Sequence, residues 1–251
     1  MDYRNKVIFG DCLENMRKMP SNCVDVTFTS PPYAEKGKEE FQDKNPCGTH
    51  RKYLNVESHI GEDWLNWQIQ VIDECLRLTK KWVVYNIGCM AHQRKYIYKL
   101  IGNYADRIHD ILIWNKPNGL PCSTPNSISN TYEFILLIKK NPKDVIHTNS
   151  KFFRNVINLP NNMNLEFNDV HHAVMNKELA DICIQEFTNE GDLVLDPFMG
   201  VGTTAVSCKQ KKRDYVGFEI CDVYYEKCLE RIENGFVQKE IKLDESSPLF
   251  L

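Results

Sequence analysis

Residues 192–219 constrain the fold more than any other stretch of the chain. Residues 193–195 form a short apolar run of the kind found in a buried parallel strand, and the run stops at Asp196, where the chain must turn. A second apolar run, residues 215–218, ends on Glu219. Nucleoside-binding α/β folds hold ribose hydroxyls with an acidic side chain at the end of their second strand. The stretch therefore predicts one β-α-β unit with a ligand at its strand ends.

Gly200 and Gly202 lie between the first of these strands and the helix that Thr203 and Thr204 open. A glycine lets the backbone approach a ligand closely because no Cβ intervenes, although such a pair is also found in plain tight turns. Phosphate binding is disfavoured, since no Gly-Lys-Ser/Thr follows and a neighbouring acidic residue would repel the anion. The pattern suits a nucleoside with free hydroxyls and a cationic group, which describes S-adenosylmethionine better than a nucleotide.

The remaining apolar runs predict an open α/β sheet. Seven strands are indicated, at residues 7–9, 24–29, 82–87, 108–114, 132–138, 193–195 and 215–218. Helical spacing separates most of them, so we expect a mostly parallel sheet with one late antiparallel hairpin. Residues 34–62 are polar and irregular, and so is most of 115–170. We expect one domain over residues 1–251 with these two irregular regions attached.

The composition is ordinary for a globular protein. Of the 251 residues, 42% are hydrophobic and 26% are charged, which allows one large core. No run of about 18 apolar residues is present, and the first residues lack the apolar core of a signal peptide. We therefore expect an intracellular, cytoplasmic protein with no membrane partner.

The cysteines predict buried thiols rather than a metal site. There are 10 of them, with no Cys-x-x-Cys pair and no paired histidines at zinc-finger spacing. Several fall in predicted strands or helices, where a free thiol packs as a small apolar group. We expect reduced cysteines and no bound metal.

The net charge of -3 does not by itself indicate a nucleic-acid-binding protein, because such domains are usually basic. The basic residues are nevertheless clustered in two polar stretches. These are Lys36, Lys38, Lys44, Arg51 and Lys52, and then Lys139, Lys140, Lys143, Lys151 and Arg154. Such patches can contact a polyanion even when the total charge is negative, and a solvated surface is the alternative interpretation.

Ser30-Pro31-Pro32-Tyr33 ends the strand predicted at residues 24–29. Two successive prolines continue neither a ladder nor a helix, so the backbone leaves the sheet in a stiff, extended form. In such a sheet, ligands lie at the carboxyl ends of the strands. We therefore expect this turn beside residues 196–202, together with Asp11, which follows the strand at residues 7–9. A rigid turn without chemistry is the alternative.

The two turns together resemble the paired motifs of the amino-methylating DNA methyltransferases that use S-adenosylmethionine. In that family, Asp/Asn/Ser-Pro-Pro-Tyr/Phe forms the target-base pocket, and Asp-Pro-Phe-x-Gly-x-Gly-Thr-Thr forms the methionine end of the cofactor site. The base motif comes first in this chain, which is similar to the permuted order of the β class. The likeness extends from Gly10 to the helix after Glu219, and it implies the Rossmann-like fold of these methyltransferases.

The resemblance also implies a role for each matching residue. Binding and activation of the base would fall to Ser30, Pro31, Pro32 and Tyr33. Cofactor binding would fall to Asp11, Cys12, His172, Asp196, Pro197, Phe198, Gly200, Gly202, Thr203, Thr204 and Glu219. His172 is equally consistent with a surface residue.

A physical argument supports the assigned role of the Ser-Pro-Pro turn. An exocyclic base amine is conjugated with its ring, so its lone pair is poorly available for attack on a sulfonium methyl. The Ser30 hydroxyl and the Pro31 carbonyl, held by stiff prolines, would accept its N–H groups and free the lone pair. Tyr33 offers a ring on which an extruded base can stack.

Serine at position 30 is typical of the cytosine-N4 members, whereas adenine-N6 members usually carry Asp or Asn. The resemblance therefore implies methylation of the N4 amine of a flipped cytosine in DNA. Adenine-N6 methylation is the first alternative, and a non-catalytic nucleoside- or nucleic-acid-binding protein is the second. C5-cytosine methylation by Cys47 or Cys122 is disfavoured, because neither cysteine follows a strand in the place that Ser30 occupies.

The implied partner is DNA, with its sequence read by residues 34–62 and 115–170. The resemblance admits a companion restriction endonuclease, as in prokaryotic or phage restriction-modification systems. Monomer and homodimer both stay open.

Overall fold

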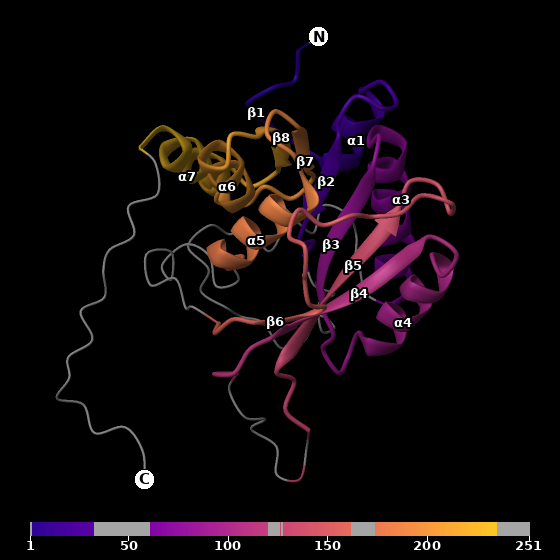
Figure 1. The fold of residues 1–251 in the computed structure, drawn as a ribbon. Coiled ribbons are helices and arrows are strands. Elements are labelled where there is room, and N and C mark those ends of the chain that lie inside the picture. The colour runs from indigo at the N-terminus through magenta and orange to yellow at the C-terminus, as the bar shows by residue number, and fades with distance from the viewer. Residues whose placement is uncertain (1, 33–60, 120–125, 127, 162–173, 235–251) are drawn as a thin grey trace, which may run out of the picture.

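The computed structural model describes residues 2–32, 61–119, 126, 128–161 and 174–234. They contain one 8-stranded sheet with the order β1-β8-β7-β2-β3-β5-β4-β6 (Figure 1). In that spatial order the strands are β1 (Lys6–Phe9), β8 (Asp214–Glu219), β7 (Leu193–Asp196), β2 (Val26–Thr29), β3 (Trp82–Gly88), β5 (Tyr132–Lys139), β4 (Ile108–Asn115) and β6 (Val156–Asn158). The α/β fold predicted from the sequence is therefore confirmed.

Helices cover both faces of the sheet (Figure 1). One face carries α1 (Cys12–Arg17), α3 (Glu62–Leu78) and α4 (Arg94–Asn103), and the other carries α5 (Lys177–Phe187), α6 (Thr203–Gln210) and α7 (Asp222–Asn234). None of the described helices is long and apolar enough to cross a membrane.

The alternation of side chains along the central strands builds one core on each face. On β3, Val83, Tyr85 and Ile87 pack under α1, α3 and α4, whereas Val84 packs under the opposite helices. All four side chains are at most 1% exposed. A strand covered on both faces is apolar at every position rather than at alternate ones. This explains why β3 and β5 are continuous apolar runs in the sequence.

Strand β5 runs antiparallel to both of its neighbours, β3 and β4, and the other described pairs are parallel. The predicted hairpin is thus present as β4 and β5. The sheet also contains β6, which lies in a segment predicted to be irregular and pairs with β4. It has only 3 residues, of which Ile157 alone is buried. A strand this short has too little periodicity to be recognised in the sequence.

The connections after β2 and β7 diverge to opposite faces of the sheet. The chain leaves β2 toward α3 on one face and leaves β7 toward α6 on the other. These two strands are parallel neighbours, with Thr27 opposite Leu195. Open α/β sheets bind ligands in the crevice where adjacent connections diverge in this way. The fold therefore places the Ser-Pro-Pro turn and the glycine turn side by side.

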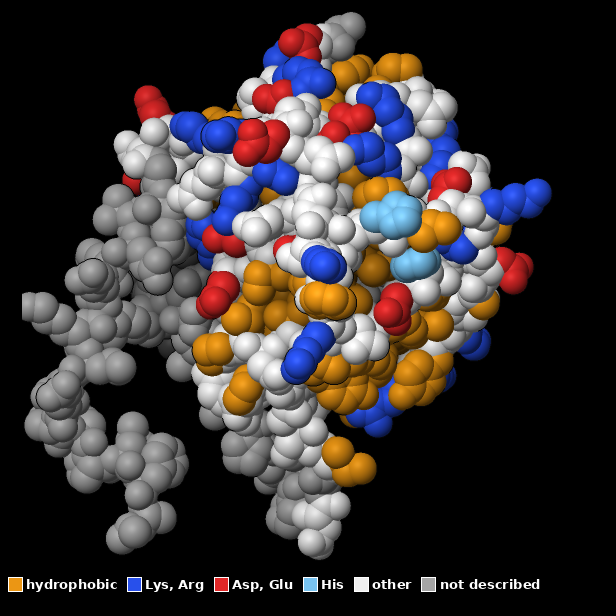
Figure 2. Space-filling view, in the orientation of Figure 1, with side chains coloured by type: hydrophobic (Ala, Val, Ile, Leu, Met, Phe, Trp, Pro, Cys, Tyr) orange, Lys and Arg blue, Asp and Glu red, His pale blue; other side chains and the backbone are white. Residues whose placement is uncertain are grey.

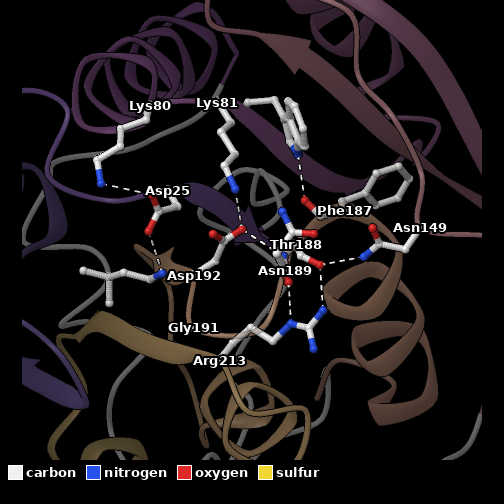
Figure 3. Close-up of polar contacts among 12 residues, drawn as sticks. Asp25, Lys80, Lys81, Asn149, Phe187, Thr188, Asn189, Gly191, Asp192 and Arg213 are labelled. Carbon is white, nitrogen blue, oxygen red and sulfur yellow. Dashed lines mark hydrogen bonds and ion pairs between the residues drawn. The ribbon is translucent and has the colours of Figure 1, made fainter.

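Polar contacts connect the strands at the amino-terminal ends of the parallel strands, which is the edge of the sheet opposite to the two turns (Figure 3). Lys81 Nζ donates to Asp192 Oδ2 at 2.6 Å, and Lys80 Nζ donates to Asp25 Oδ1 at 3.0 Å. Asp25 Oδ2 also accepts the backbone N–H of Leu193 at 2.9 Å. These bonds tie the first residues of β2, β3 and β7 together, so this edge has a structural role.

Candidate functional site

Asp196 joins the two turns that the sequence singled out. Its Oδ1 accepts the Thr29 hydroxyl at 2.6 Å and the Phe198 backbone N–H at 3.0 Å. Its Oδ2 accepts the Thr204 hydroxyl at 2.5 Å. Thr29 is the last residue of β2 and precedes Ser30, whereas Thr204 lies in the first turn of α6. One buried carboxylate thus connects β2, the glycine turn and the start of α6.

Burial raises the pKa of Asp196, and the hydrogen bonds from Thr204, Thr29 and Phe198 partly offset this rise. The side chain is 1% exposed. Since both carboxylate oxygens already accept hydrogen bonds inside the protein, Asp196 positions the surrounding turn rather than reaching out to a ligand. Thr29 is a residue of the site that the sequence reasoning missed. The sequence feature that could have indicated Thr29 is the presence of two threonines, Thr27 and Thr29, in an otherwise apolar strand.

The glycine turn requires glycine at position 202. Gly202 has φ +84°, and a Cβ placed there would lie 2.7 Å from Cys228 Sγ. Gly200 also has a positive φ, of 54°. L residues with a side chain rarely adopt this conformation. The turn therefore brings bare backbone to the sheet edge immediately before α6, where the N–H groups of a helix N-terminus also point.

Glu219 lies against this turn from the end of β8. Its Oε2 accepts the backbone N–H of Gly200 at 2.8 Å, and its Oε1 accepts the backbone N–H of Cys221 at 2.7 Å. A carboxylate has about four lone-pair sites, and these two backbone N–H groups take up one on each oxygen. These contacts hold the carboxylate where a nucleoside bound over the turn would meet it.

Asp11 is at the same edge, one strand further along. Strand β1 pairs with β8 with Phe9 opposite Glu219, and the Gly10 N–H donates to the Glu219 carbonyl at 2.8 Å. Asp11 caps α1 by accepting the Glu14 N–H on Oδ1 at 2.9 Å. The thiol of the next residue, Cys12, faces the core, and burial with the nearby Asp11 charge raises its pKa. At this position the thiol is enclosed in the core.

The Ser-Pro-Pro turn is held from two sides. Ser30 Oγ accepts a hydrogen bond from Asn86 Nδ2 at 3.2 Å, and the Pro32 carbonyl accepts one from Trp64 Nε1 at 3.3 Å. Trp64 is in the first turn of α3 and is 1% exposed. The turn is therefore anchored to β3 and to α3. The Ser30 hydroxyl keeps a second lone pair with which it can accept a donor.

A buried charged pair supports Asn86 and was also missed in the sequence reasoning. Asn86 Nδ2 donates to Glu133 Oε2 at 2.8 Å, and the other Glu133 oxygen pairs with Lys116 Nζ. Asn86 is near the end of β3, and Glu133 is near the start of the antiparallel strand β5. The sequence feature that could have indicated this pair is Glu133, a single acidic residue in the otherwise apolar run of β5.

The predicted residues meet at one edge as far as the structure describes them. Asp196, Pro197, Thr203 and Thr204 are buried in or under the glycine turn. Phe198 and Gly200 are half-buried, and the ring of Phe198 packs at 5.4 Å from that of Trp67 on α3. Tyr33 and His172 lie outside the described residues. The described cysteines are free, and all of them except Cys23 are buried, as predicted for them. No three described His, Cys, Asp or Glu side chains are placed to hold a metal ion.

The second basic cluster lies partly at the opposite edge. Lys139, at the end of β5, lies opposite Trp82, the first residue of β3, in the sheet register. Lys140 Nζ donates to the Leu76 and Arg77 carbonyls at the end of α3. Lys140 therefore stabilises a helix end away from the site, and Lys139 Nζ donates to the Pro142 carbonyl. Over the upper part of the face in Figure 2, basic side chains alternate with acidic ones. The described part of that face offers no continuous basic surface.

The geometry fits a nucleoside with a cationic group. The turn of residues 196–202 supplies the half-buried backbone of Gly200, Glu219 supplies fixed carboxylate oxygens, and the adjacent Ser-Pro-Pro turn supplies a hydroxyl. A carboxylate at the strand end suits ribose hydroxyls and a positive charge.

Comparison with known proteins identifies the family. A family model described as DNA methylase, for the N6/N4 enzymes, matches residues 24–230. The chain is 34% identical to the type II methyltransferase M.Cfr9I of Citrobacter freundii, over 89% of this chain and 86% of that protein. It is 33% identical to the type II methyltransferase M.SmaI of Serratia marcescens, over 90% of each.

Solved structures show the same fold. The PvuII DNA methyltransferase, described as cytosine-N4-specific, superimposes with a TM-score of 0.71 at 17% identity, over 95% of this chain and 88% of that one. TTHA0409 of Thermus thermophilus, a putative DNA modification methylase in complex with S-adenosyl-L-methionine, gives 0.64 at 22% identity, over 92% and 93%. The chain therefore belongs to the N6/N4 amino DNA methyltransferase family, whose enzymes act with S-adenosylmethionine.

Proposed function

We propose that this methyltransferase acts on the N4 amine of a cytosine turned out of the DNA duplex. One observation carries the proposal. Ser30, in the Ser-Pro-Pro turn at the end of β2, is joined through Thr29 to Asp196, the first residue of the glycine turn. A base held by Ser30 would therefore lie beside a cofactor held by the glycine turn.

The cofactor supplies a methyl group on a positively charged sulfur, which makes the methyl carbon electrophilic. The backbone at Gly200 and Gly202 would lie along the methionine part, with Phe198 at its border. Glu219 would accept the ribose hydroxyls, and the backbone at Asp11 and Cys12 would border the nucleoside from β1. Asp196, Thr203 and Thr204 would act by holding the turn, because their side chains already bond within the protein.

The base would be activated by acceptors rather than by a strong base. The second lone pair of the Ser30 hydroxyl and the Pro31 carbonyl would accept the amine N–H groups and weaken conjugation with the ring. The freed nitrogen lone pair would take the methyl group from the cofactor, whose sulfur would leave as a neutral thioether, and the proton released from the amine would pass to solvent water. Preorganised acceptors of this kind lower a barrier without reorganising during the reaction. Tyr33 would stack on the base, and His172 would cover the methionine part.

The choice of cytosine is based on Ser30. Serine at this place is typical of the cytosine-N4 enzymes, and a hydroxyl is a shorter acceptor than the Asp or Asn side chain of most adenine-N6 enzymes. Adenine-N6 methylation is the second candidate, since adenine presents the same type of amine. A pocket retained without catalysis is a third reading, which an activity assay separates from both.

DNA recognition would fall to residues 34–62 and to those parts of 115–170 that lie at the site edge. Lys116 and Asn158 are at the ends of β4 and β6, both on that edge. Their neighbours in the chain would therefore contact DNA, whereas Lys139 and Lys140 would not. A companion restriction endonuclease would recognise the same sequence, and the enzyme would act as a monomer or a homodimer.

The product nucleoside tests the proposal. The protein would be incubated with labelled S-adenosylmethionine and DNA from a methylation-deficient bacterial host, and the digested DNA would be examined by mass spectrometry. We expect N4-methylcytosine. N6-methyladenine would overturn the assigned base, and transfer to no DNA would favour the non-catalytic binding protein.

A further inference from the structure

A buried polar chain extends from the Ser-Pro-Pro turn across two strands. Asn86 Nδ2 donates to Ser30 Oγ at 3.2 Å and to Glu133 Oε2 at 2.8 Å. Glu133 Oε1 pairs with Lys116 Nζ, which also lies 4.3 Å from the centroid of the Trp114 ring. Asn86 is 2% exposed and Glu133 is 5% exposed. A buried carboxylate is compensated here by a cation and an amide rather than by water.

This chain fixes which way the Asn86 amide faces. An ionised carboxylate accepts hydrogen bonds and donates none, so the nitrogen of the amide must face Glu133. The opposite orientation would place Oδ1 against a carboxylate oxygen and would deprive Ser30 Oγ of its donor. Both N–H groups of Asn86 are thereby engaged. Its Oδ1 is buried and has no hydrogen-bond partner among the described residues.

We propose that Asn86 Oδ1 is a further acceptor for the exocyclic amine of the target base. In this proposal, Glu133 and Lys116 are positioning residues that hold the Asn86 amide in the required orientation. The inference rests on the function proposed above. Oδ1 would accept one N–H of the amine, and the Ser30 hydroxyl and the Pro31 carbonyl would take the other.

The covalent geometry agrees with this arrangement. The two polar atoms of an amide are about 2.2 Å apart, so Oδ1 lies at most about 5.5 Å from Ser30 Oγ. Two acceptors that each lie about 2.9 Å from an amine nitrogen, along its two N–H directions, are about 5 Å apart. The hydrogen bond from Asn86 to Ser30 therefore allows the spacing that one amine needs between Oδ1 and Ser30 Oγ. An unpaired buried acceptor is unfavourable in the free protein, and a ligand amine would satisfy it.

A purely structural role is the competing explanation, because buried ion pairs also brace folds. The chain offers a matched control at the opposite edge of the sheet. There Lys81 Nζ donates to Asp192 Oδ2 at 2.6 Å, again between a lysine and a partly buried carboxylate (Figure 3). Asp192 also accepts the Asn189 backbone N–H at 2.9 Å. Replacing either acid by its amide removes a buried charge of the same kind, but only Glu133 is connected to Ser30.

The test compares Asn86→Ala, Glu133→Gln and the control Asp192→Asn. Single-turnover methyl transfer to DNA from a methylation-deficient host would be measured alongside cofactor affinity and thermal stability. We expect Asn86→Ala to slow transfer by about 30-fold or more, in the range found when one preorganised transition-state partner is removed. Glu133→Gln should slow transfer by about 10-fold, because its amide no longer fixes Asn86. Both variants should bind the cofactor within about twofold of the wild type.

Asp192→Asn should lose stability while its transfer rate stays within about twofold of the wild type. Unchanged transfer in Asn86→Ala, or losses in Glu133→Gln no larger than those in Asp192→Asn, would overturn the proposal. The methylated nucleoside that the wild-type protein produces is identified separately by mass spectrometry. Methyl transfer to adenine would refute only the assigned base, since the variants still test Asn86 on an adenine amine. Transfer to no DNA would overturn both proposals.

Discussion

Replacing Thr29 by valine isolates the hydrogen bond that joins the two halves of the site. Thr29 Oγ1 donates to Asp196 Oδ1 at 2.6 Å, and the two side chains are 0% and 1% exposed. Valine keeps the shape of threonine but puts a methyl group where the donor was. Because the site is buried, water has no access to replace the lost hydroxyl.

The expected loss of stability follows from the charge of the acceptor. A hydrogen bond to a charged group contributes about 1.5–3 kcal/mol. Asp196 keeps its bonds from the Phe198 N–H and the Thr204 hydroxyl, so we expect a loss of about 2 kcal/mol, near the lower end of that range. For a chain of this size the melting temperature should fall by about 4–8 °C. The pKa of Asp196 should rise further, because one of the bonds that offset its burial is gone.

Thr27→Val is the matched control on the same strand. Thr27 is 0% exposed, and its hydroxyl shares a 2.7 Å hydrogen bond with that of Thr79. Both partners are neutral, so the loss should be about 0.5–1.5 kcal/mol. Urea unfolding would measure stability, and calorimetry would measure S-adenosylmethionine binding. We expect Thr29→Val to weaken binding by about 3- to 10-fold, corresponding to roughly 0.7–1.4 kcal/mol, and Thr27→Val to leave it unchanged.

The reasoning would be refuted if the two variants lost equal stability and bound the cofactor equally well. That outcome would mean that the link from Thr29 to Asp196 does not hold the glycine turn in its binding geometry.

Three further predictions follow from the same edge of the sheet. Gly202→Ala should lose about 2–4 kcal/mol in urea unfolding, from its left-handed backbone and the contact with Cys228 Sγ. The control Gly102→Ala, with open space around its Cβ in helix α4, should instead gain about 0.5–1 kcal/mol, and equal effects would contradict the account. Because the native pKa of Asp196 is raised, its contribution to stability falls as pH rises above about 4 until the native carboxyl ionises. Asp196→Asn should remove this fall, so its stability relative to the wild type should improve across that window, whereas a constant difference would argue against a raised pKa. Burial and the nearby Glu219 and Asp196 charges raise the pKa of Cys228 to about 12. Mass spectrometry after iodoacetamide treatment near pH 8 should find this thiol unmodified in the native protein and modified in urea, and rapid native labelling would contradict its burial.

The parts of the fold that could be predicted from the sequence are those encoded locally. The β7-α6-β8 unit is an apolar run, a glycine turn and a second apolar run within one short stretch, and its strands pair as expected. The Ser-Pro-Pro turn was also visible locally, because two prolines must end a strand. In contrast, β6 is only 3 residues long and gains its place by pairing with β4. Nothing in its own residues indicates that partner.

The contacts that organise the site depend on strand order, which the sequence does not state. Thr29 meets Asp196 only because β2 and β7 are neighbours, although they are far apart in the chain. Glu133 reaches Asn86 only because β5 inserts antiparallel beside β3. The residue types were visible as polar positions in apolar strands. Their partners became evident once the strands were placed side by side.

The division of roles between the two turns is the central claim, and a paired comparison of Ser30→Ala and Glu219→Ala tests it most directly. Turnover and cofactor affinity would be measured for each variant with labelled S-adenosylmethionine and unmethylated DNA. We expect Ser30→Ala to lower turnover far more than cofactor affinity, because in the proposed function Ser30 would hold the base. Glu219→Ala should mainly weaken cofactor binding, because its carboxylate holds the Gly200 N–H and, in the proposed function, would accept the ribose hydroxyls. Equal loss of cofactor binding in both variants would contradict the account.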